Sequence, residues 1–492
     1  MILQLMETKS MKNRKLYFVI ALMLLALLSV LSGCTATESV FDGGSVAVNQ
    51  SEINLSTSDG GYKITKAGTY ELTGDMTGMV VVDADGAKVE IVLNNVNLSN
   101  PNNAAIYVKD AKKVTISTTA GSVNTISCDA FENLDDNTID GVIFCKSDLT
   151  LKGEGTLIVN GASLEGHGIV CKDELKIKSG TYEINAKKTA IQANDYVGIE
   201  GGEITINAGT KGIHCDGVLD VLDGNITVLG STEGFEALKI NISGGHTDIT
   251  ASDDGLNATN GSGMDDGMNF GRGGFGQQDV GAVNDVIDSD MQINISGGYL
   301  HVNAQGDGID SNGTFNMTGG EVYVSGPTNN GNGALDFGRS GSISGGTIIA
   351  AGSSGMAETL ESDSQGVIQL NVAGAEGDKV IVTDTAGKEI VSWIAEKQFE
   401  NIVISSPEFK ENGTYNVQVA DMVREITLEG HSYSEGGNRF GGPGGFGGHD
   451  GGNRQEGFGR PEGFDKQEDL GGLNEFGRPD DFVGPGGSKR RQ

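Results

Sequence analysis

Basic residues are scarce in this sequence. It contains 34 Lys and Arg against 67 Asp and Glu, so the formal net charge of the 492-residue chain is −33. So acidic a surface repels nucleic acids and anionic lipids, and it favours bound cations. We therefore expect no nucleic-acid partner.

Proline, tryptophan and cysteine are also scarce. The chain has 7 Pro, 1 Trp and 5 Cys, whereas it has 78 Gly. This composition is poor in helix-forming residues, which argues against an α/β enzyme. Since the sequence has no CxxC or Cys/His spacing, no zinc site is predicted.

One apolar run near the N-terminus is typical of an export signal. Residues 16–31 are largely apolar and follow the basic residues Lys12, Arg14 and Lys15. A run of this length is short for a membrane span. It ends in Leu31-Ser32-Gly33-Cys34, which resembles the lipobox of bacterial lipoproteins.

The lipobox resemblance implies cleavage before Cys34 and lipidation of that cysteine. We expect a signal peptide at 1–33, a linker at 34–44, and a protein held by its lipid on the extracellular face of the bacterial cell membrane. An uncleaved anchor, or a signal cut elsewhere, is the alternative.

The central part of the chain is repetitive. A pattern of about 22 residues returns between residues 167 and 351, and its units consist of short strands separated by glycine turns. One column of the repeat contains Ile169, Ile191, Ile213, Phe235, Leu256, Ile309 and Leu335, and a second, two positions later, contains Cys171, Ala193, Cys215, Ala237, Ala258 and Ser311. Because residues two apart on a strand point the same way, we expect both columns on one buried face.

A unit of this size cannot bury its own apolar residues, so it must stack on its neighbours. Helical repeats need roughly 33 or more residues and few glycines, whereas β-helix repeats consist of strands. We therefore predict an all-β protein, a parallel β-helix in which each repeat forms one coil. An ordinary β-sandwich with chance glycine spacing is the alternative.

The same patterns predict the domain organisation. We expect the β-helix at 45–364, with irregular first coils at 45–165, regular coils at 166–351 and a Gly-rich insertion at 261–290. Longer strands at 365–430 predict a small C-terminal β domain or cap. Residues 431–492 are rich in Gly, Phe, Arg and Asp, and since such a composition cannot pack a core, we expect a disordered tail.

The cysteines after Cys34 are predicted to be stacked thiols. Cys171 and Cys215 lie two coils apart, roughly 10 Å at a spacing of about 4.8 Å per strand, which is beyond disulfide reach. Cys145 and Cys171 could lie on neighbouring coils, so a disulfide between them is the alternative.

Two further columns of the repeat become acidic at the same place. The residue between the two buried columns is expected to face solvent, and it reads Val170, Gln192, His214, Glu236, Asn257, Asp310 and Asp336. The residue before the first glycine of each copy reads His167, Thr189, Lys211, Glu233, Asp254 and Asp307. Carboxylates would therefore meet on consecutive coils.

Stacked carboxylates need compensation. At about 5 Å apart they repel by roughly 3 kcal/mol per pair at an effective dielectric of about 20, so either protons or a divalent cation should lie among them. Hard oxygen ligands in flexible, Gly-rich surroundings favour Ca²⁺ over zinc or magnesium. The candidate ligands are Glu233, Glu236, Asp253, Asp254, Asn257, Asp307, Asp310 and Asp336. A solvated acidic face is the alternative.

Several segments carry a family resemblance. ITKAGTYELTGD, KVEIVLNNVNLSN, AAIYVKDAKKVTI and the coils with GxDGID-like turns resemble the secreted bacterial carbohydrate-binding family of right-handed β-helices, of the clostridial cellulose- and polygalacturonate-binding type. The resemblance covers about 45–429. The long Gly-rich insertion and tail depart from the family pattern.

The resemblance implies a fold similar to pectate lyases, binding of acidic plant cell-wall polysaccharide, and Ca²⁺ held by acidic turns. The calcium role would fall on Glu233, Glu236, Asp254, Asp307 and Asp310. We expect a monomeric, calcium-dependent binding protein for a polysaccharide such as polygalacturonate. A calcium-dependent lyase with Lys211 as the base is one alternative, and a surface adhesion or assembly protein is another.

Overall fold

The computed structural model describes residues 50–58, 60–131, 139–161, 166–260 and 290–435. The expected signal peptide, linker and lipidated Cys34 lie outside these residues, as do positions 261–289 of the insertion and 436–492 of the tail. Within the described ranges, no helix is long and apolar enough to span a bilayer.

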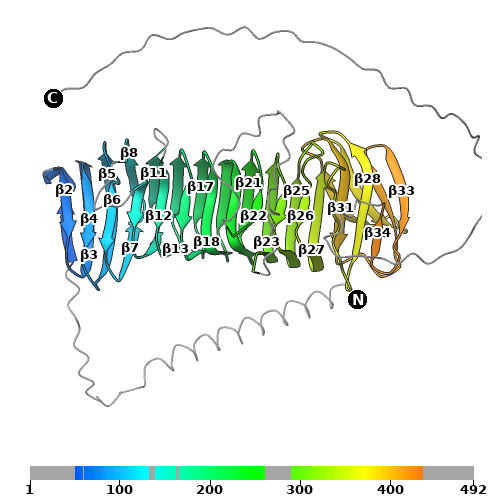
Figure 1. The fold of residues 1–492 in the computed structure, drawn as a ribbon, viewed down its shortest axis with the longest axis horizontal. Helices are drawn as coiled ribbons and strands as arrows, with labels where there is room; N and C mark the ends of the chain where they lie inside the picture. The colour runs from blue at the N-terminus through cyan, green and yellow to red at the C-terminus, as the bar shows by residue number, and fades with distance from the viewer. Residues whose placement is uncertain (1–49, 59, 132–138, 162–165, 261–289, 436–492) are drawn as a thin grey trace, which may run out of the picture. The chain divides into compact units, whose positions relative to one another are not determined.

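The described chain is a parallel β-helix followed by a small antiparallel sheet (Figure 1). Its only helical element in the described ranges is the 3-10 turn η2 (Leu55–Thr57). Each coil contributes strands to three faces, and every strand of a face pairs in parallel with the equivalent strand of the next coil. The predicted all-β solenoid is confirmed.

The first face consists of β2 (Gly61–Ile64), β4 (Met79–Asp83), β6 (Ile106–Asp110), β9 (Gly141–Cys145), β12 (His167–Cys171), β15 (Ile191–Ala193), the first halves of β18 (Lys211–Val221) and β20 (Glu233–Ile242), β22 (Leu256–Ala258), β24 (Ile309–Ser311) and β26 (Leu335–Phe337).

The second face consists of β1 (Gln50–Asn54), β3 (Gly68–Thr77), β5 (Lys88–Asn100), β7 (Lys113–Thr118), β10 (Asp148–Gly153), β13 (Glu174–Ile177), β16 (Tyr196–Ile199), the second halves of β18 and β20, and the first halves of β23 (Gln292–Ala304), β25 (Thr314–Ser325) and β27 (Ser340–Gly352).

The third face consists of the end of β5, β8 (Val123–Cys128), β11 (Thr156–Gly161), β14 (Thr181–Ala186), β17 (Glu203–Ala208), β19 (Asn225–Gly230), β21 (His246–Ala251) and the second halves of β23, β25 and β27.

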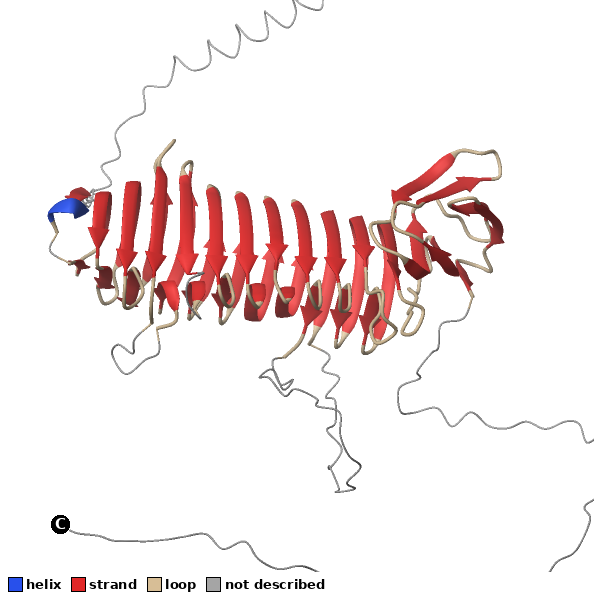
Figure 2. Ribbon diagram, turned by 90° about the horizontal axis from the view of Figure 1, so that it is seen from above, coloured by secondary structure: helices blue, strands red, loops and turns tan. Residues whose placement is uncertain are grey.

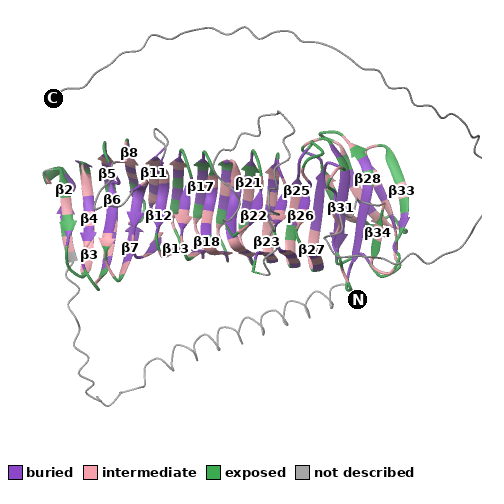
Figure 3. Cartoon of the chain, viewed as in Figure 1, coloured by how far each residue is buried: buried purple, intermediate pink, exposed green. Residues whose placement is uncertain are grey.

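The register of the first face matches the repeat. Ile213 pairs with Phe235 and Phe235 with Leu256, and in the second column Cys215 pairs with Ala237. All these side chains are buried in one continuous core. Buried and less buried residues alternate along the strands (Figure 3), as the period-two pattern predicts.

Glycine allows the coils to turn close to one another. The second glycine of each recurring pair has a positive φ, for example 76° at Gly245 and 78° at Gly298. A Cβ on Gly245 would lie 2.5 Å from the carbonyl oxygen of Gly224 one coil away. Only glycine avoids both the strained φ and this collision.

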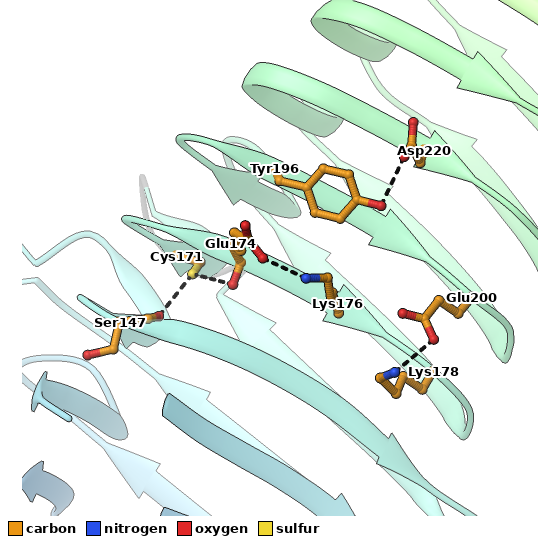
Figure 4. Close-up of polar contacts among 8 residues, drawn as sticks. All are labelled: Ser147, Cys171, Glu174, Lys176, Lys178, Tyr196, Glu200 and Asp220. Atoms are coloured by element: carbon orange, nitrogen blue, oxygen red, sulfur yellow. Dashed lines mark hydrogen bonds and ion pairs between the residues drawn. The ribbon is translucent and has the colours of Figure 1, made fainter. Parts of the chain in front are cut away.

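The cysteines of the core are free thiols. Cys145 and Cys171 pair in register on neighbouring coils, and both are buried and unlinked. Their Sγ atoms donate to the Ser147 carbonyl at 2.9 and 3.3 Å, and Figure 4 shows the Cys171 contact. Cys128 and Cys215 are also buried and free. The prediction of stacked thiols is confirmed, and the alternative disulfide is not formed.

On the outside of the second face, side-chain donors of one coil contact carboxylates of the next coil. Lys178 donates to Glu200 on the next coil at 2.8 Å, and Tyr196 donates to Asp220 at 3.0 Å (Figure 4). Here the stacking of coils brings each carboxylate next to a donor.

The last coil continues into antiparallel strands (Figure 2). β31 (Phe399–Ser406) pairs with β27 and with β28 (Gly366–Gly374), and a separate four-stranded sheet contains β29 (Lys379–Asp384), β30 (Glu389–Ile394), β32 (Thr414–Val419) and β33 (Met422–Thr427). These strands cover the end of the solenoid, which would otherwise expose an unpaired edge.

The tail begins later than expected. Ser432–Ser434 forms β34, which pairs in parallel with β28. Glu435 then forms an ion pair with Arg424 at 2.9 Å. The backbone pairing and this ion pair hold 431–435 on the folded part, so the predicted boundary at 431 was wrong.

Phe235→Ala is expected to destabilise the solenoid, because Phe235 is 0% exposed in the middle of the first column. The loss should be about 3–5 kcal/mol of unfolding free energy, measured by urea denaturation. Leu229→Ala is the control, since Leu229 is 60% exposed and its loss should stay within about 0.5 kcal/mol. Equal effects of the two substitutions would contradict the packing described.

Candidate functional site

One row of side chains runs along the outside of the first face. In register it reads Val81, Tyr107, Phe144, Val170, Gln192, His214, Glu236, Asn257, Asp310 and Asp336. We call this row the outer ladder. It confirms the predicted pairing of Glu236 with Asn257, of Asn257 with Asp310 and of Asp310 with Asp336. The row changes from apolar to polar to acidic along the solenoid.

The sequence analysis expected the outer ladder to face solvent, but in the structure its side chains are buried or partly buried. Val170 is 0% and Glu236 4% exposed, and the other members from Gln192 onward are partly buried. At the apolar end, Val170 packs with Phe144 and Ile139 in a small separate core. At the acidic end, side chains from the preceding column lie against the ladder, so simple strand alternation did not predict its burial.

Glu233 and Glu236 form a cluster with one cation, the Lys211 ammonium, and with the imidazole of His214. Glu236 lies 2.7 Å from Lys211 Nζ and 2.7 Å from His214 Nδ1, and it is hydrogen-bonded to Glu233. Burial acts to raise the pKa of Glu236, but the hydrogen bonds of His214, Glu233 and Lys211 outweigh it and lower the pKa. Burial and the neighbouring Glu236 raise the pKa of Glu233.

The next coils hold carboxylates without such cations. We call Asp254, Asp307, Asp310, Asp336 and Glu358 the carboxylate cluster. Burial first, and then neighbouring carboxylates, raise the pKa of Asp254 to about 7 and that of Asp310 to about 8. Burial likewise raises the pKa of Asp307 to about 6 and that of Glu358 to about 7. In the described residues, no lysine or arginine forms an ion pair with any of the five.

Backbone donors hold the carboxylate cluster in place. Asp254 Oδ1 accepts from the Asp307 amide at 2.7 Å, and Asp307 Oδ1 accepts from the Gly333 amide at 2.5 Å. Glu358 Oε2 accepts from the Phe337 amide at 3.0 Å. Each bond joins neighbouring coils, so the carboxylates are positioned by the solenoid itself.

Glu358 was missed by the sequence analysis. It belongs to the segment between β27 and β28, beyond the last recognisable copy of the repeat. No column contains it, so only its spacing of about one coil from Asp336 could have pointed to it. The structure brings it close enough to Asp336 and Asp307 for their charges to raise its pKa.

The donors around the carboxylate cluster suit a hard cation. Asn257 Oδ1 is buried and has no hydrogen-bond partner. Asp253 Oδ1 and Asp254 Oδ1 converge beside Gly306, where a Cβ would lie 2.4 Å from both. All these donors are oxygens, which Ca²⁺ and Mg²⁺ prefer. As placed, however, the described His, Cys, Asp and Glu side chains form no group of three with metal-binding geometry.

The carboxylate cluster makes stability depend on pH. The folded pKa values of Asp254, Asp307, Asp310 and Glu358 are raised above unfolded values of about 4. The folded state therefore binds more protons between about pH 4 and pH 8, and its stability falls as pH rises through this window. In chelator, the urea midpoint should be higher at pH 5 than at pH 8, and Asp310→Asn should reduce the difference. A midpoint that rises with pH would contradict this prediction.

Comparisons with known proteins identify the family of this chain. Residues 58–329, more than half of the chain, match the family described as "Carbohydrate-binding domain-containing protein". A relative with that description from Acetivibrio thermocellus is 35% identical over 164 residues, which are 32% of this chain and 56% of the relative. The chain thus spans only about half the length of that relative.

A solved structure described as a polysaccharide lyase-like protein from C. thermocellum is 28% identical. The match covers 42% of this chain and 90% of that protein, with a TM-score of 0.34. The match over residues 58–329 shows the family. The chain belongs to the carbohydrate-binding domain-containing proteins.

Proposed function

We propose that the protein binds acidic polysaccharide at the cell surface through Ca²⁺ held at the carboxylate cluster. The observation that carries this proposal is the set of five partly buried carboxylates whose pKa values are all raised and which form no ion pair with a lysine or arginine of the described residues. Such a set is unstable when fully ionised, and a divalent cation would remove the repulsion.

Calcium suits this site better than other common metals. The available donors are carboxylate and amide oxygens, with no thiolate and no imidazole among them, which disfavours zinc. Calcium accepts irregular sets of about 6–8 oxygens, whereas magnesium requires a near-octahedral shell. Asp254, Asp307, Asp310, Asp336 and Glu358 would hold the ion, with Asn257 and the exposed Asp253 at the edge.

In this proposal Glu233 and Glu236 do not hold the calcium ion. Lys211 already compensates Glu236, and burial together with Glu236 raises the pKa of Glu233. These two glutamates would order the coil before the ion site and would not contribute a full negative charge to the metal.

An acidic glycan needs such a cation to approach this protein. With a net charge of −33, the chain repels a uronate polymer unless a doubly charged ion lies between the two sets of carboxylates. Membership of a carbohydrate-binding family supports a polysaccharide partner. A polygalacturonate chain, with one carboxylate on each sugar, is the ligand we propose for this site.

Cys34 completes the proposal. Lipidation of that residue after export would hold a monomeric protein on the extracellular face of the membrane, where plant cell-wall polysaccharide is encountered. The export and lipobox patterns of the sequence support this location.

Lys211 favours binding over the lyase alternative. A general base must be free of its proton, but Lys211 is 2.7 Å from the ionised Glu236 in a mostly buried pair. An opposite charge so close stabilises the protonated ammonium.

Asp310→Asn is expected to weaken calcium binding and polygalacturonate retention together. Loss of one buried carboxylate should reduce Ca²⁺ affinity roughly tenfold or more, as for other ligand changes. Isothermal titration would measure the affinity, and retention on a polygalacturonate column with and without chelator would measure binding. Asp363→Asn is the matched control, since Asp363 is exposed. Retention that chelator leaves intact would overturn the calcium proposal.

Lys211→Met tests the lyase alternative. Since it leaves Glu236 buried with one partner fewer, it should lower the unfolding free energy by about 3 kcal/mol. The parent protein should release no ultraviolet-absorbing unsaturated product from polygalacturonate in the presence of Ca²⁺. Product release that stops in the variant would instead establish a lyase.

A further inference from the structure

A groove lies where the third face meets the four-stranded sheet. Tyr299 and Tyr323 line it from β23 and β25, and Lys379, Ser392 and Trp393 line it from β29 and β30. Its volume is about 530 Å³, within the range of about 300–1,000 Å³ typical of small-molecule sites. None of the residues of the outer ladder or of the carboxylate cluster lines this groove.

Other rings hold the aromatic side chains of the groove in place. Tyr299 stacks on His246, with ring centroids 4.3 Å apart and an interplanar angle of 3°. The ring centroids of Tyr299 and Tyr323 are 5.6 Å apart. On the opposite wall, the ring centroids of Trp393 and Phe399 are 6.2 Å apart. Tyr299, Tyr323 and Trp393 are only partly buried. These contacts fix the orientation of three partly exposed aromatic side chains that line the groove.

Polar groups stand beside these rings. Glu396 accepts from Asn303 Nδ2 at 3.1 Å and lies 2.8 Å from His301 Nε2, so its carboxylate is fixed at the groove. Lys379 and Ser392 are exposed and carry an ammonium and a hydroxyl. The groove therefore offers donors and acceptors next to apolar surface.

We propose that this groove is a second glycan subsite, which takes a pyranose ring without a metal ion. One face of a pyranose carries C–H bonds that pack on the electron-rich face of an aromatic ring, while its hydroxyls need both donors and acceptors at the edge. A purely apolar ligand would not use the exposed Lys379 ammonium or the Ser392 hydroxyl. This inference rests on the proposed function in that the ligand is a polysaccharide.

Part of the groove lies outside the segment that matches the family. One wall consists of residues from 379–396, whereas the match covers only 58–329. The C-terminal sheet would therefore add a contact to those of the β-helix. A glycan held at two points is retained more strongly than at either alone, provided that it spans both.

Trp393 allows a direct test, because it is the only tryptophan in the chain. Cellohexaose, a neutral glucan, should change its fluorescence in a saturable way in the presence of chelator. Tyr299→Leu keeps an apolar side chain but removes the flat ring, and should weaken this response at least roughly fivefold. Tyr299→Phe keeps the ring and should largely restore it. Leu229→Ala, outside the groove, should have no effect.

The outcomes separate this inference from the proposed function. If neither cellohexaose nor hexagalacturonate changes Trp393 emission in chelator, or if Tyr299→Leu responds as the parent does, the groove is not a glycan subsite. Calcium-dependent retention on polygalacturonate can still hold in that case. Conversely, a saturable change of Trp393 fluorescence in chelator would support the glycan subsite in the groove. If retention on polygalacturonate were also independent of calcium, the proposed calcium site would be overturned.

Discussion

The structure depends on parallel hydrogen bonding between successive coils. This pairing places residues that are one coil apart in sequence next to each other, about 4.8 Å apart. Ile213, Phe235 and Leu256 are neighbours for this reason. A residue type that recurs at one position of the repeat therefore forms a continuous column of side chains. Such a column can be an apolar core or a row of charged groups.

The outer ladder shows what such a column does to charge. At its centre, His214 and Lys211 lie beside Glu236 and lower its pKa. Farther along, Asp310 lies in register between Asn257 and Asp336, and burial together with neighbouring carboxylates raises its pKa to about 8. The same geometry thus yields a compensated cluster and an uncompensated one, and the difference is set by which residues occupy consecutive coils.

The sequence predicted which residues stack on consecutive coils better than it predicted the side chains around them. The period and the alternation identified the fold, and they placed Asn257 between Glu236 and Asp310, because both depend on backbone pairing alone. Burial of the ladder was not predicted, since it depends on side chains from adjacent columns. Glu358 and the wall of the groove that contains Trp393 were missed because they come from non-repetitive segments, whose positions no periodicity fixes.

The fold does not force the carboxylate cluster to be uncompensated. On the second face, the same stacking brings Lys178 to Glu200 at 2.8 Å, so a lysine one coil from a carboxylate is readily accommodated. A basic residue in place of Asn257 would be the equivalent solution on the outer ladder, but the chain has an amide whose oxygen is buried without a partner. Raised carboxyl pKa values destabilise the folded protein as pH rises. The calcium ion that we propose for this site would neutralise a set of acidic residues that costs stability and that the architecture could have neutralised with a basic side chain.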